Sequence, residues 1–194
     1  MNEMEAGELA KYFFELGQLS YVKNAGWWVA KVKDPASVAE HSFKTAVIAY
    51  VLAKLERHPE PEKIAVKALL HDAHETRLLD RHKISTAYFR TPGSVVEKIK
   101  KDQCSRLPEP VRGDLLELLG GEEGDLVKDA GYLEYSVTGK EYFDLGYQDA
   151  WDWIERSGKV LKTKTAKQLH AKISKMDSGA WWRGLKESVE ELKY

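Results

Sequence analysis

Residues 37–75 read SVAEHSFKTAVIAYVLAKLERHPEPEKIAVKALLHDAHE and have the clearest helical patterning of the chain. The first part predicts a helix that begins after Ser37, because a serine followed three residues later by Glu40 forms a capping box. Apolar residues recur at helical spacing from Val38 onward, and His41 lies on the same stripe. The pattern therefore predicts a helix with a histidine on its buried face.

A second helix is predicted from Pro61, because proline is favoured in the first turn of helices. Apolar residues then recur every three or four positions, and Asp72 continues that stripe. At about 100° per residue, His71 and Glu75 lie on either side of Asp72. His74 is expected on the opposite, charged face of the same helix.

His41, His71 and Asp72 are thus expected to converge inside the protein. A buried imidazole or carboxylate loses hydration worth several kcal/mol and needs a partner, and a divalent cation satisfies both groups at once. A single buried histidine is more often a hydrogen-bonded core residue, and Asp72 alone is as easily a helix cap or an ion-pair partner. The convergence of three such groups favours a metal site.

The succession of motifs resembles the HD-domain metal-dependent phosphohydrolases, and within them the branch that contains the 5'-deoxynucleotidases. The resemblance rests on Gly26-Trp27, Ser37-Val38-Ala39-Glu40-His41-Ser42, and Leu70-His71-Asp72 followed by Glu75 and Asp80. It implies that His41, His71 and Asp72 hold a divalent metal ion. Two histidines and a carboxylate suit Mn, Co, Fe, Ni or Zn.

The resemblance also implies roles for residues around the metal. Glu75 and Asp80 are expected to act as catalytic groups, and the segment Asp80-Arg81-His82-Lys83 to contribute to substrate contact. The expected substrate-binding residues are Asn24, Trp27, Arg81, His82 and Lys83. Without the resemblance, Asp80 is better explained as an acid that pairs with Arg81, and Trp27 as a core residue.

The chain departs from the family pattern at two positions. Asn24 stands where the family has an arginine, three residues before the tryptophan, so a bidentate phosphate contact is missing. Gly131 stands where the family has its last metal-binding aspartate. Asp129 is expected to face away by roughly 160° on a helix, and Glu134, one turn later, is not expected to replace the ligand. The basic residues that remain as candidates for the phosphate are Lys23, Arg77, Arg81 and Lys83.

Three functional hypotheses follow from these residues. The first is a divalent-metal-dependent 5'-nucleotidase that releases phosphate from (deoxy)nucleoside 5'-monophosphates. The second is a degenerate HD domain that binds a nucleotide or a protein partner without turnover, because Asn24 and Gly131 break the pattern. The third is hydrolysis of another phosphoester, such as a diester or a polyphosphate.

The composition predicts one all-α domain over residues 1–194, with a C-terminal helical extension over about 145–194. The chain has 194 residues, of which 43% are hydrophobic, and no segment alternates as a strand would. A net charge of −1 argues against binding to a nucleic-acid polymer, and no apolar run approaches the ~20 residues that cross a bilayer.

The cellular setting is inferred from two further features of the sequence. Cys104 is the single cysteine, so an intrachain disulfide is excluded, and the acidic start of the chain shows no apolar signal segment. We therefore expect a cytoplasmic protein. Aromatic residues near the C-terminal end are compatible with a homodimer, and a monomer is the alternative.

Overall fold

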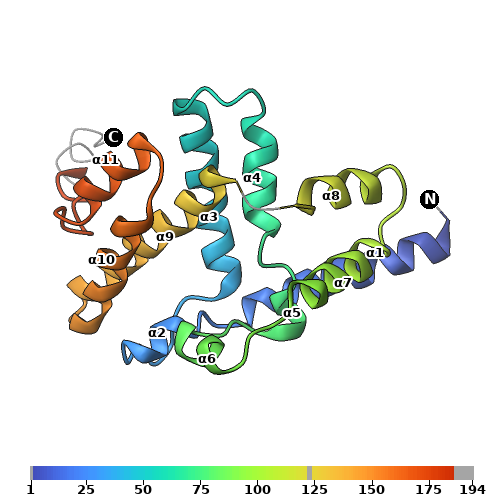
Figure 1. Ribbon diagram of the computed structural model, residues 1–194, viewed down its shortest axis with the longest axis horizontal. Coiled ribbons are helices and arrows are strands. Elements are labelled where there is room, and N and C mark those ends of the chain that lie inside the picture. The colour runs from blue at the N-terminus through green and yellow to red at the C-terminus, as the bar shows by residue number, and fades with distance from the viewer. Residues whose placement is uncertain (1, 122–123, 186–194) are drawn as a thin grey trace, which may run out of the picture.

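The computed structural model describes residues 2–121 and 124–185, and within them the chain is helical apart from turns, short connections and one isolated β-bridge. The helices are α1 (Glu3–Gly17), η1 (Gln18–Ser20), α2 (Gly26–Val29), α3 (Val38–Leu55), α4 (Pro61–Leu70), α5 (Glu75–Leu78), α6 (Lys83–Tyr88), α7 (Gly93–Cys104), α8 (Val111–Leu119), α9 (Asp125–Asp144), η2 (Gln148–Ala150), α10 (Trp151–Val160) and α11 (Lys164–Ile173). The predicted all-α fold is confirmed (Figure 1).

The centre of the molecule is formed by α3 and α4, which run side by side, with α9 packed against both (Figure 1). Leu52 of α3, Ala68 of α4 and Leu133 of α9 are buried in one hydrophobic cluster. Side chains at such sites contribute through the apolar area that they remove from water. This cluster fixes α3, α4 and α9 relative to one another, and the candidate site is built from α3, α9 and the turn that follows α4.

Local signals in the sequence set where α3 and α4 begin. The Ser37 hydroxyl accepts a hydrogen bond from the Glu40 amide (3.2 Å), and the Glu40 carboxylate accepts one from the Ser37 amide (2.6 Å). These two bonds satisfy amide groups that would otherwise lack partners at a helix start. Pro61 occupies the first turn of α4, as predicted.

Two helical groups flank this centre (Figure 1). On one side, Tyr12 of α1 packs with Cys104 and Leu119, which end α7 and α8. On the other side, α10 and α11 pack against α9. Within the described residues, no helix is long and apolar enough to cross a bilayer.

Candidate metal centre

His41 lies near the start of α3 and is only 2% exposed. Its Nδ1 is 2.6 Å from Oε2 of Glu134 on α9, and its ring stacks on that of Tyr135 with 5.0 Å between centroids. A carboxylate at Nδ1 fixes the tautomer that carries a proton there, which leaves the Nε2 lone pair to bind an ion. This Nε2 lies 3.7 Å from Oδ2 of Asp72.

His71 and Asp72 lie in a turn, and the prediction that they continue the second helix was wrong. Helix α4 ends at Leu70, and residues 71–74 form turns before α5 begins at Glu75. Here the backbone hydrogen bond spans three residues instead of the four of an α-helix, since the Ala73 amide donates to the carbonyl of Leu70 (3.1 Å). Neighbouring residues in a helix diverge by about 100°, and the turn instead brings these two side chains together.

The His71 ring is oriented in the same way as that of His41. Its Nδ1 lies 2.6 Å from the carbonyl oxygen of Ala68, and its Nε2 lies 3.0 Å from Oδ2 of Asp72. One donor atom each from His41, His71 and Asp72 lies within 4.8 Å of the others. The predicted convergence of these three residues is confirmed, although the backbone that produces it is a turn.

The charge on Asp72 is maintained by its neighbours. Burial alone would raise the pKa of this carboxyl, but the His71 imidazole, followed by those of His41 and His74, holds the pKa well below its usual range. Asp72 is therefore an anion at neutral pH. Two imidazole nitrogens and one carboxylate oxygen face a common point.

Glu75 and Asp80 add two more carboxyl groups to this region. Burial, followed by the charges of Asp72 and Asp80, raises the pKa of Glu75 to about 10. Burial also raises the pKa of Asp80, although the Ala25 amide, 2.6 Å from Oδ2, acts in the opposite direction. Three carboxyl groups thus share one poorly hydrated region, where a bound cation would favour their charged forms.

The predicted position of His74 was also wrong. The sequence pattern placed it on the charged face opposite Asp72, whereas its ring is half-buried and offers a nitrogen within 4.8 Å of donor atoms of Asp72 and Glu75. The prediction extended the helical period beyond Leu70, where the helix ends. Burial lowers the pKa of His74, so its imidazole is neutral at pH 7.

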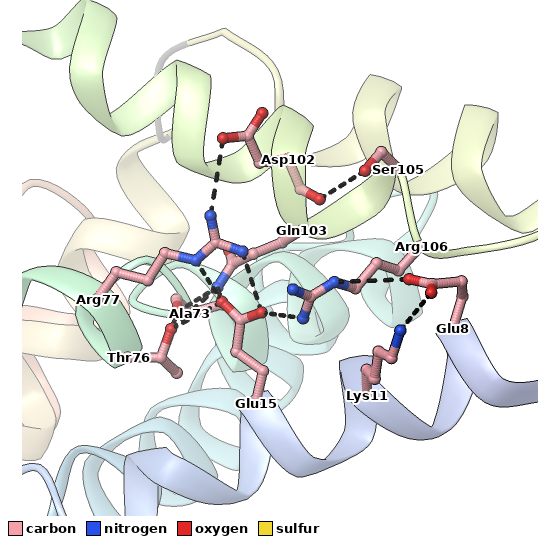
Figure 2. A network of polar contacts seen from close by, with 10 residues as sticks. All are labelled: Glu8, Lys11, Glu15, Ala73, Thr76, Arg77, Asp102, Gln103, Ser105 and Arg106. Carbon is pink, nitrogen blue, oxygen red and sulfur yellow. Dashed lines mark hydrogen bonds and ion pairs between the residues drawn. The ribbon is translucent and has the colours of Figure 1, made fainter.

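A polar network anchors this turn to α1 and α7 (Figure 2). Gln103 of α7 donates from Nε2 to the carbonyl of Ala73 (3.0 Å) and to the carboxylate of Glu15 on α1 (2.9 Å). The same carboxylate accepts from Arg77 and Arg106, each at 2.6 Å. Because Ala73 follows the His-Asp pair directly, the network holds the backbone of the metal-ligand turn.

A cavity of about 560 Å³ lies beside the cluster. Asp80 and Tyr135 line it, and Tyr135 is the residue whose ring stacks on His41. The five residues predicted to bind substrate all line the same cavity: Asn24, Trp27, Arg81, His82 and Lys83. Helix α10 contributes Trp153 and Arg156 to its wall, and the sequence analysis had given neither residue a role.

Asn24 and Trp27 are the buried members of this set. The Asn24 amide nitrogen donates to the carbonyl of Ser37 (3.3 Å), so the side chain joins the α2 segment to the start of α3. Trp27 is 1% exposed and packs against Trp153 and Tyr142, with ring centroids 5.4 Å and 5.1 Å away. Trp27 is therefore a packing residue that also lines the cavity.

The four basic candidates for phosphate contact differ in their positions. Lys23 pairs with the carboxylate of Asp34 (2.7 Å), and Arg77 belongs to the network with Glu15. Arg81 lines the cavity while its guanidinium donates to the carbonyl of Phe89 (3.0 Å) and to Thr91. Lys83 lines the cavity with its Nζ 5.8 Å from the centroid of the Tyr132 ring. His82 caps α6 by accepting a hydrogen bond from the Ser85 amide (3.1 Å).

Comparison with known proteins places the chain in a family. The family model described as 5'-deoxynucleotidase YfbR-like matches residues 11–148, which is more than half of the chain. The chain belongs to the YfbR-like 5'-deoxynucleotidase family. It is 27% identical over 151 residues to the 5'-deoxynucleotidase HDDC2 of Bos taurus, covering 75% of this chain and 73% of that protein. The Homo sapiens HDDC2 is 27% identical over 149 residues, covering 74% and 72%.

Solved structures show the same YfbR-like architecture. The crystal structure of the genomics protein APC5600 is 30% identical and covers 91% of this chain and 99% of that one, with a TM-score of 0.76. A conserved hypothetical protein from Pyrococcus furiosus, 24% identical, covers 86% and 99% with a TM-score of 0.66 and shares the fold. The resemblance to HD-domain phosphohydrolases is thereby confirmed.

The YfbR-like family implies a divalent metal, and the residues present fit one. Imidazole nitrogens and a carboxylate oxygen suit a first-row divalent ion. His41 and His71 each have Nδ1 beside an acceptor and Nε2 directed toward Asp72, which is the usual arrangement of histidines that bind metals.

The structure also shows the surroundings of Gly131, the glycine at which this YfbR-like chain departs from the expected pattern. Gly131 lies about one turn before Glu134 and Tyr135 on α9, and a Cβ built there meets nothing within 4 Å. Asp129 is buried and its carboxylate accepts from the amides of Lys162 (2.8 Å) and Thr163 (2.7 Å). Asp129 therefore anchors the connection between α10 and α11 and does not replace a metal ligand.

The sequence analysis did not give Glu134 its contact with His41. It was not expected to replace the missing metal ligand, and its carboxylate is buried and hydrogen-bonded to His41. One signal was available, because Glu134 follows Gly131 by three positions and so lies near the same helix face. What the sequence did not show was that α9 crosses α3 at the level of His41.

Proposed function

We propose that this protein is a divalent-metal-dependent phosphomonoesterase that releases phosphate from nucleoside 5'-monophosphates, with deoxynucleotides as preferred substrates. The main support is the convergence of His41 Nε2 and His71 Nε2 on Oδ2 of Asp72, beside the cavity that Asp80 lines. Membership of the YfbR-like family supports a nucleotide as the substrate.

In this proposal His41, His71 and Asp72 bind the ion, which can be Mn, Co, Zn, Fe or Ni. The ion supplies Lewis acidity, which polarises a phosphoryl oxygen and lowers the pKa of water. The protein orients the ligands: Glu134 fixes the ring of His41, and the carbonyl of Ala68 fixes that of His71. Fixed ligands of this kind bind an ion without first having to be ordered.

Glu75 and Asp80 are the proposed catalytic carboxylates. Asp80 lines the cavity and is held by the Ala25 amide, so we assign to it the orientation of the attacking water and the removal of its proton. Glu75 offers a donor atom close to one of Asp72, and a bound cation would favour the charged form of its carboxyl. As the P–O bond to the 5'-oxygen breaks and inorganic phosphate departs, Asp80 returns the proton that it took from water to the 5'-oxygen.

The nucleotide is proposed to occupy the cavity lined by Asn24, Trp27, Arg81, His82 and Lys83. Arg81 and Lys83 offer the positive charge that Asn24 lacks. Trp27, fixed among other aromatic rings, gives the cavity a rigid wall. Both cationic side chains contact phosphate more weakly than a dedicated bidentate arginine, so substrate affinity is expected to be modest.

A second candidate function is nucleotide binding without turnover. Gly131 favours it, because α9 supplies no carboxylate at that position and the ion has only three protein ligands. Catalytic metal sites with three protein ligands are common, which is why hydrolysis is preferred here.

The test is phosphate release from a panel of ribo- and deoxyribonucleoside 5'-monophosphates, with metal-stripped protein resupplied separately with Mn, Co, Zn and Mg. Metal-dependent release that favours deoxynucleotides is expected. The variant His71→Ala should lose turnover, whereas His58→Ala, which lies outside the site, should keep it. A folded, metal-loaded protein that binds these nucleotides and releases no phosphate would support the binding function.

We also propose that two copies associate. Trp181 is 76% exposed and Trp182 is 47% exposed, and exposed aromatic side chains are frequent at protein interfaces. Light scattering at several protein concentrations is expected to give twice the mass of one chain, and a constant mass of one chain would contradict the proposal.

A further inference from the structure

Glu134 is itself held by hydrogen bonds that lead away from the candidate metal centre. Its Oε2 contacts Nδ1 of His41, and its Oε1 accepts a hydrogen bond from the hydroxyl of Thr138, one turn later on α9. The Thr138 hydroxyl in turn accepts a hydrogen bond from Nζ of Lys44 on α3 (3.1 Å). We propose that Thr138 and Lys44 are positioning residues, which fix the Glu134 carboxylate and through it the His41 ring. This inference rests on the proposed metal centre.

The chemistry of the two ends sets the direction of these hydrogen bonds. The ammonium group of Lys44 only donates, so the Thr138 oxygen is the acceptor in that contact. The hydroxyl proton is then directed to Glu134, whose carboxylate only accepts. Hydrogen bonds that follow one another in this way polarise and strengthen each other. The Thr138 hydroxyl therefore has one orientation that satisfies both of its neighbours.

Burial makes the contact between Thr138 and Glu134 important. The two side chains belong to residues that are 2% and 1% exposed, so water has little access to replace a lost hydrogen bond. With Thr138 present, each oxygen of the Glu134 carboxylate has a partner. Without it, Oε1 would be buried and unpaired, which is costly. A carboxylate held at one oxygen alone can rotate, and its contact with Nδ1 of His41 would loosen.

Lys44 forms the outer end of the arrangement. Its side chain is 33% exposed, and its Nζ also donates to the carboxylate of Glu141 (3.0 Å). Lys44 and Thr138 line a cavity of about 240 Å³ on this side of the α3 and α9 pair. Because the ammonium group is partly exposed to water, its removal leaves the hydroxyl of Thr138 still able to donate to Glu134. We therefore expect Thr138 to contribute more than Lys44.

Thr45 offers a matched control for Thr138. It lies on α3, is fully buried, and its hydroxyl has no hydrogen-bond partner among the described residues. Replacing either threonine by valine removes a buried hydroxyl and keeps the branched shape of the side chain. Of the two hydroxyls, that of Thr138 is the one bonded to Glu134. A difference between the two variants therefore reports the hydrogen bond and not the packing.

The experiment first observes the His41 ring in metal-stripped protein. With isotopically labelled histidine, NMR spectroscopy detects the proton on Nδ1, because a hydrogen bond to a buried carboxylate slows its exchange with water. Loss of the signal in His41→Ala assigns it. We expect the signal to be lost or displaced in Thr138→Val and to be retained in Thr138→Ser, which keeps the hydroxyl, and in Thr45→Val.

Isothermal titration calorimetry then measures the consequence for the ion. We expect the affinity for Mn²⁺ to fall about 10-fold in Thr138→Val, the lower end of the effect of removing a partner of a metal ligand. Thr138→Ser and Thr45→Val should bind Mn²⁺ as the wild type does. Lys44→Met keeps the aliphatic stem and should change the NMR signal and the affinity in the same direction by less. Lys54→Met, on an exposed position of α3, is its control.

The outcomes separate this inference from the proposed function. An unchanged His41 signal in Thr138→Val would overturn the inference, and so would equal losses of Mn²⁺ affinity in Thr138→Val and Thr45→Val. If folded wild-type protein binds no divalent ion, the proposed function fails, and the NMR comparison alone still decides whether Thr138 and Lys44 hold the His41 ring. Circular dichroism of each variant verifies that it is folded.

Discussion

Nδ1 of His41 and Oε2 of Glu134 lie 2.6 Å apart, although 93 positions separate the two residues in the chain. Both side chains are buried, and the contact joins α3 to α9 at the proposed metal centre. A carboxylate at Nδ1 makes the opposite nitrogen a stronger ligand and prevents rotation of the ring. In the proposed metal centre Glu134 is therefore a positioning residue for the ion.

Replacing this carboxylate tests that role. Glu134→Gln keeps the shape of the side chain and removes its charge, so we expect the affinity for Mn²⁺ to fall about 10- to 100-fold. Isothermal titration calorimetry measures the change. Glu141→Gln on the same helix is the control, because Glu141 is more exposed and pairs with Lys44. Equal affinities in wild type and Glu134→Gln would contradict the assignment.

The open position at Gly131 predicts a gain of function. Gly131→Asp adds a carboxylate where a Cβ meets nothing within 4 Å, and we expect metal affinity to rise about tenfold, equivalent to ~1.4 kcal/mol. Gly131→Ala is the control and should stabilise α9 by about 1 kcal/mol without tighter metal binding. An aspartate that leaves affinity unchanged would show that this position does not face the ion.

Replacing Asp129 is expected to lower stability and to leave metal affinity unchanged. Asp129→Ala leaves the amides of Lys162 and Thr163 without their acceptor, so we expect the free energy of unfolding to fall by about 2–3 kcal/mol. Metal affinity should remain that of the wild type. A large loss of bound metal in folded Asp129→Ala would place this residue, rather than Gly131, at the ligand position.

The Glu15 network predicts a pH-dependent contribution to stability. Burial acts to raise the pKa of Glu15, but hydrogen bonds from Arg77 and Gln103 and the charge of Arg106 lower it overall. A carboxyl with a lowered folded pKa stabilises the protein above its unfolded value, ~4.3, and this stabilisation is lost as pH falls through the folded pKa.

Glu15→Gln removes this contribution. At pH 7 we expect the free energy of unfolding to fall by about 2 kcal/mol, because charged hydrogen bonds are lost, and the difference from wild type to shrink as pH falls below about 4. Urea unfolding at several pH values measures it. Glu8→Gln is the control, since Glu8 is more exposed and its contact with Arg106 is looser, at 4.0 Å. A difference that is the same at pH 3 and pH 7 would exclude the charge as its origin.

Much of the helical core was predictable from local sequence. The Ser37 and Glu40 capping box and Pro61 mark the starts of α3 and α4 because each acts within one turn of the backbone. His41 could be placed on the buried face from periodicity alone. The helical period gave wrong positions after Leu70, because the chain continues there as a turn while the apolar stripe suggests a longer helix. His74 was misplaced for that reason.

The parts of the site that were not predictable depend on contacts between distant segments. Glu134 reaches His41 only because α9 crosses α3. Gln103 donates to the carbonyl of Ala73 only because α7 packs beside that turn. Neither residue differs in local pattern from an ordinary polar residue of a helix. Motif resemblance supplied the ligands and the cavity residues, but it did not show which residues hold them.

The placement of the metal-ligand turn outside any regular helix has a further consequence for the protein without its ion. Residues 71–74 have few helical hydrogen bonds to protect them, so this segment should be among the first to open in local fluctuations. An ion bound to His41 and to this turn ties it to α3 and acts as a reversible cross-link. Amide hydrogen exchange in the turn should then slow, and the melting temperature should rise with the concentration of free metal.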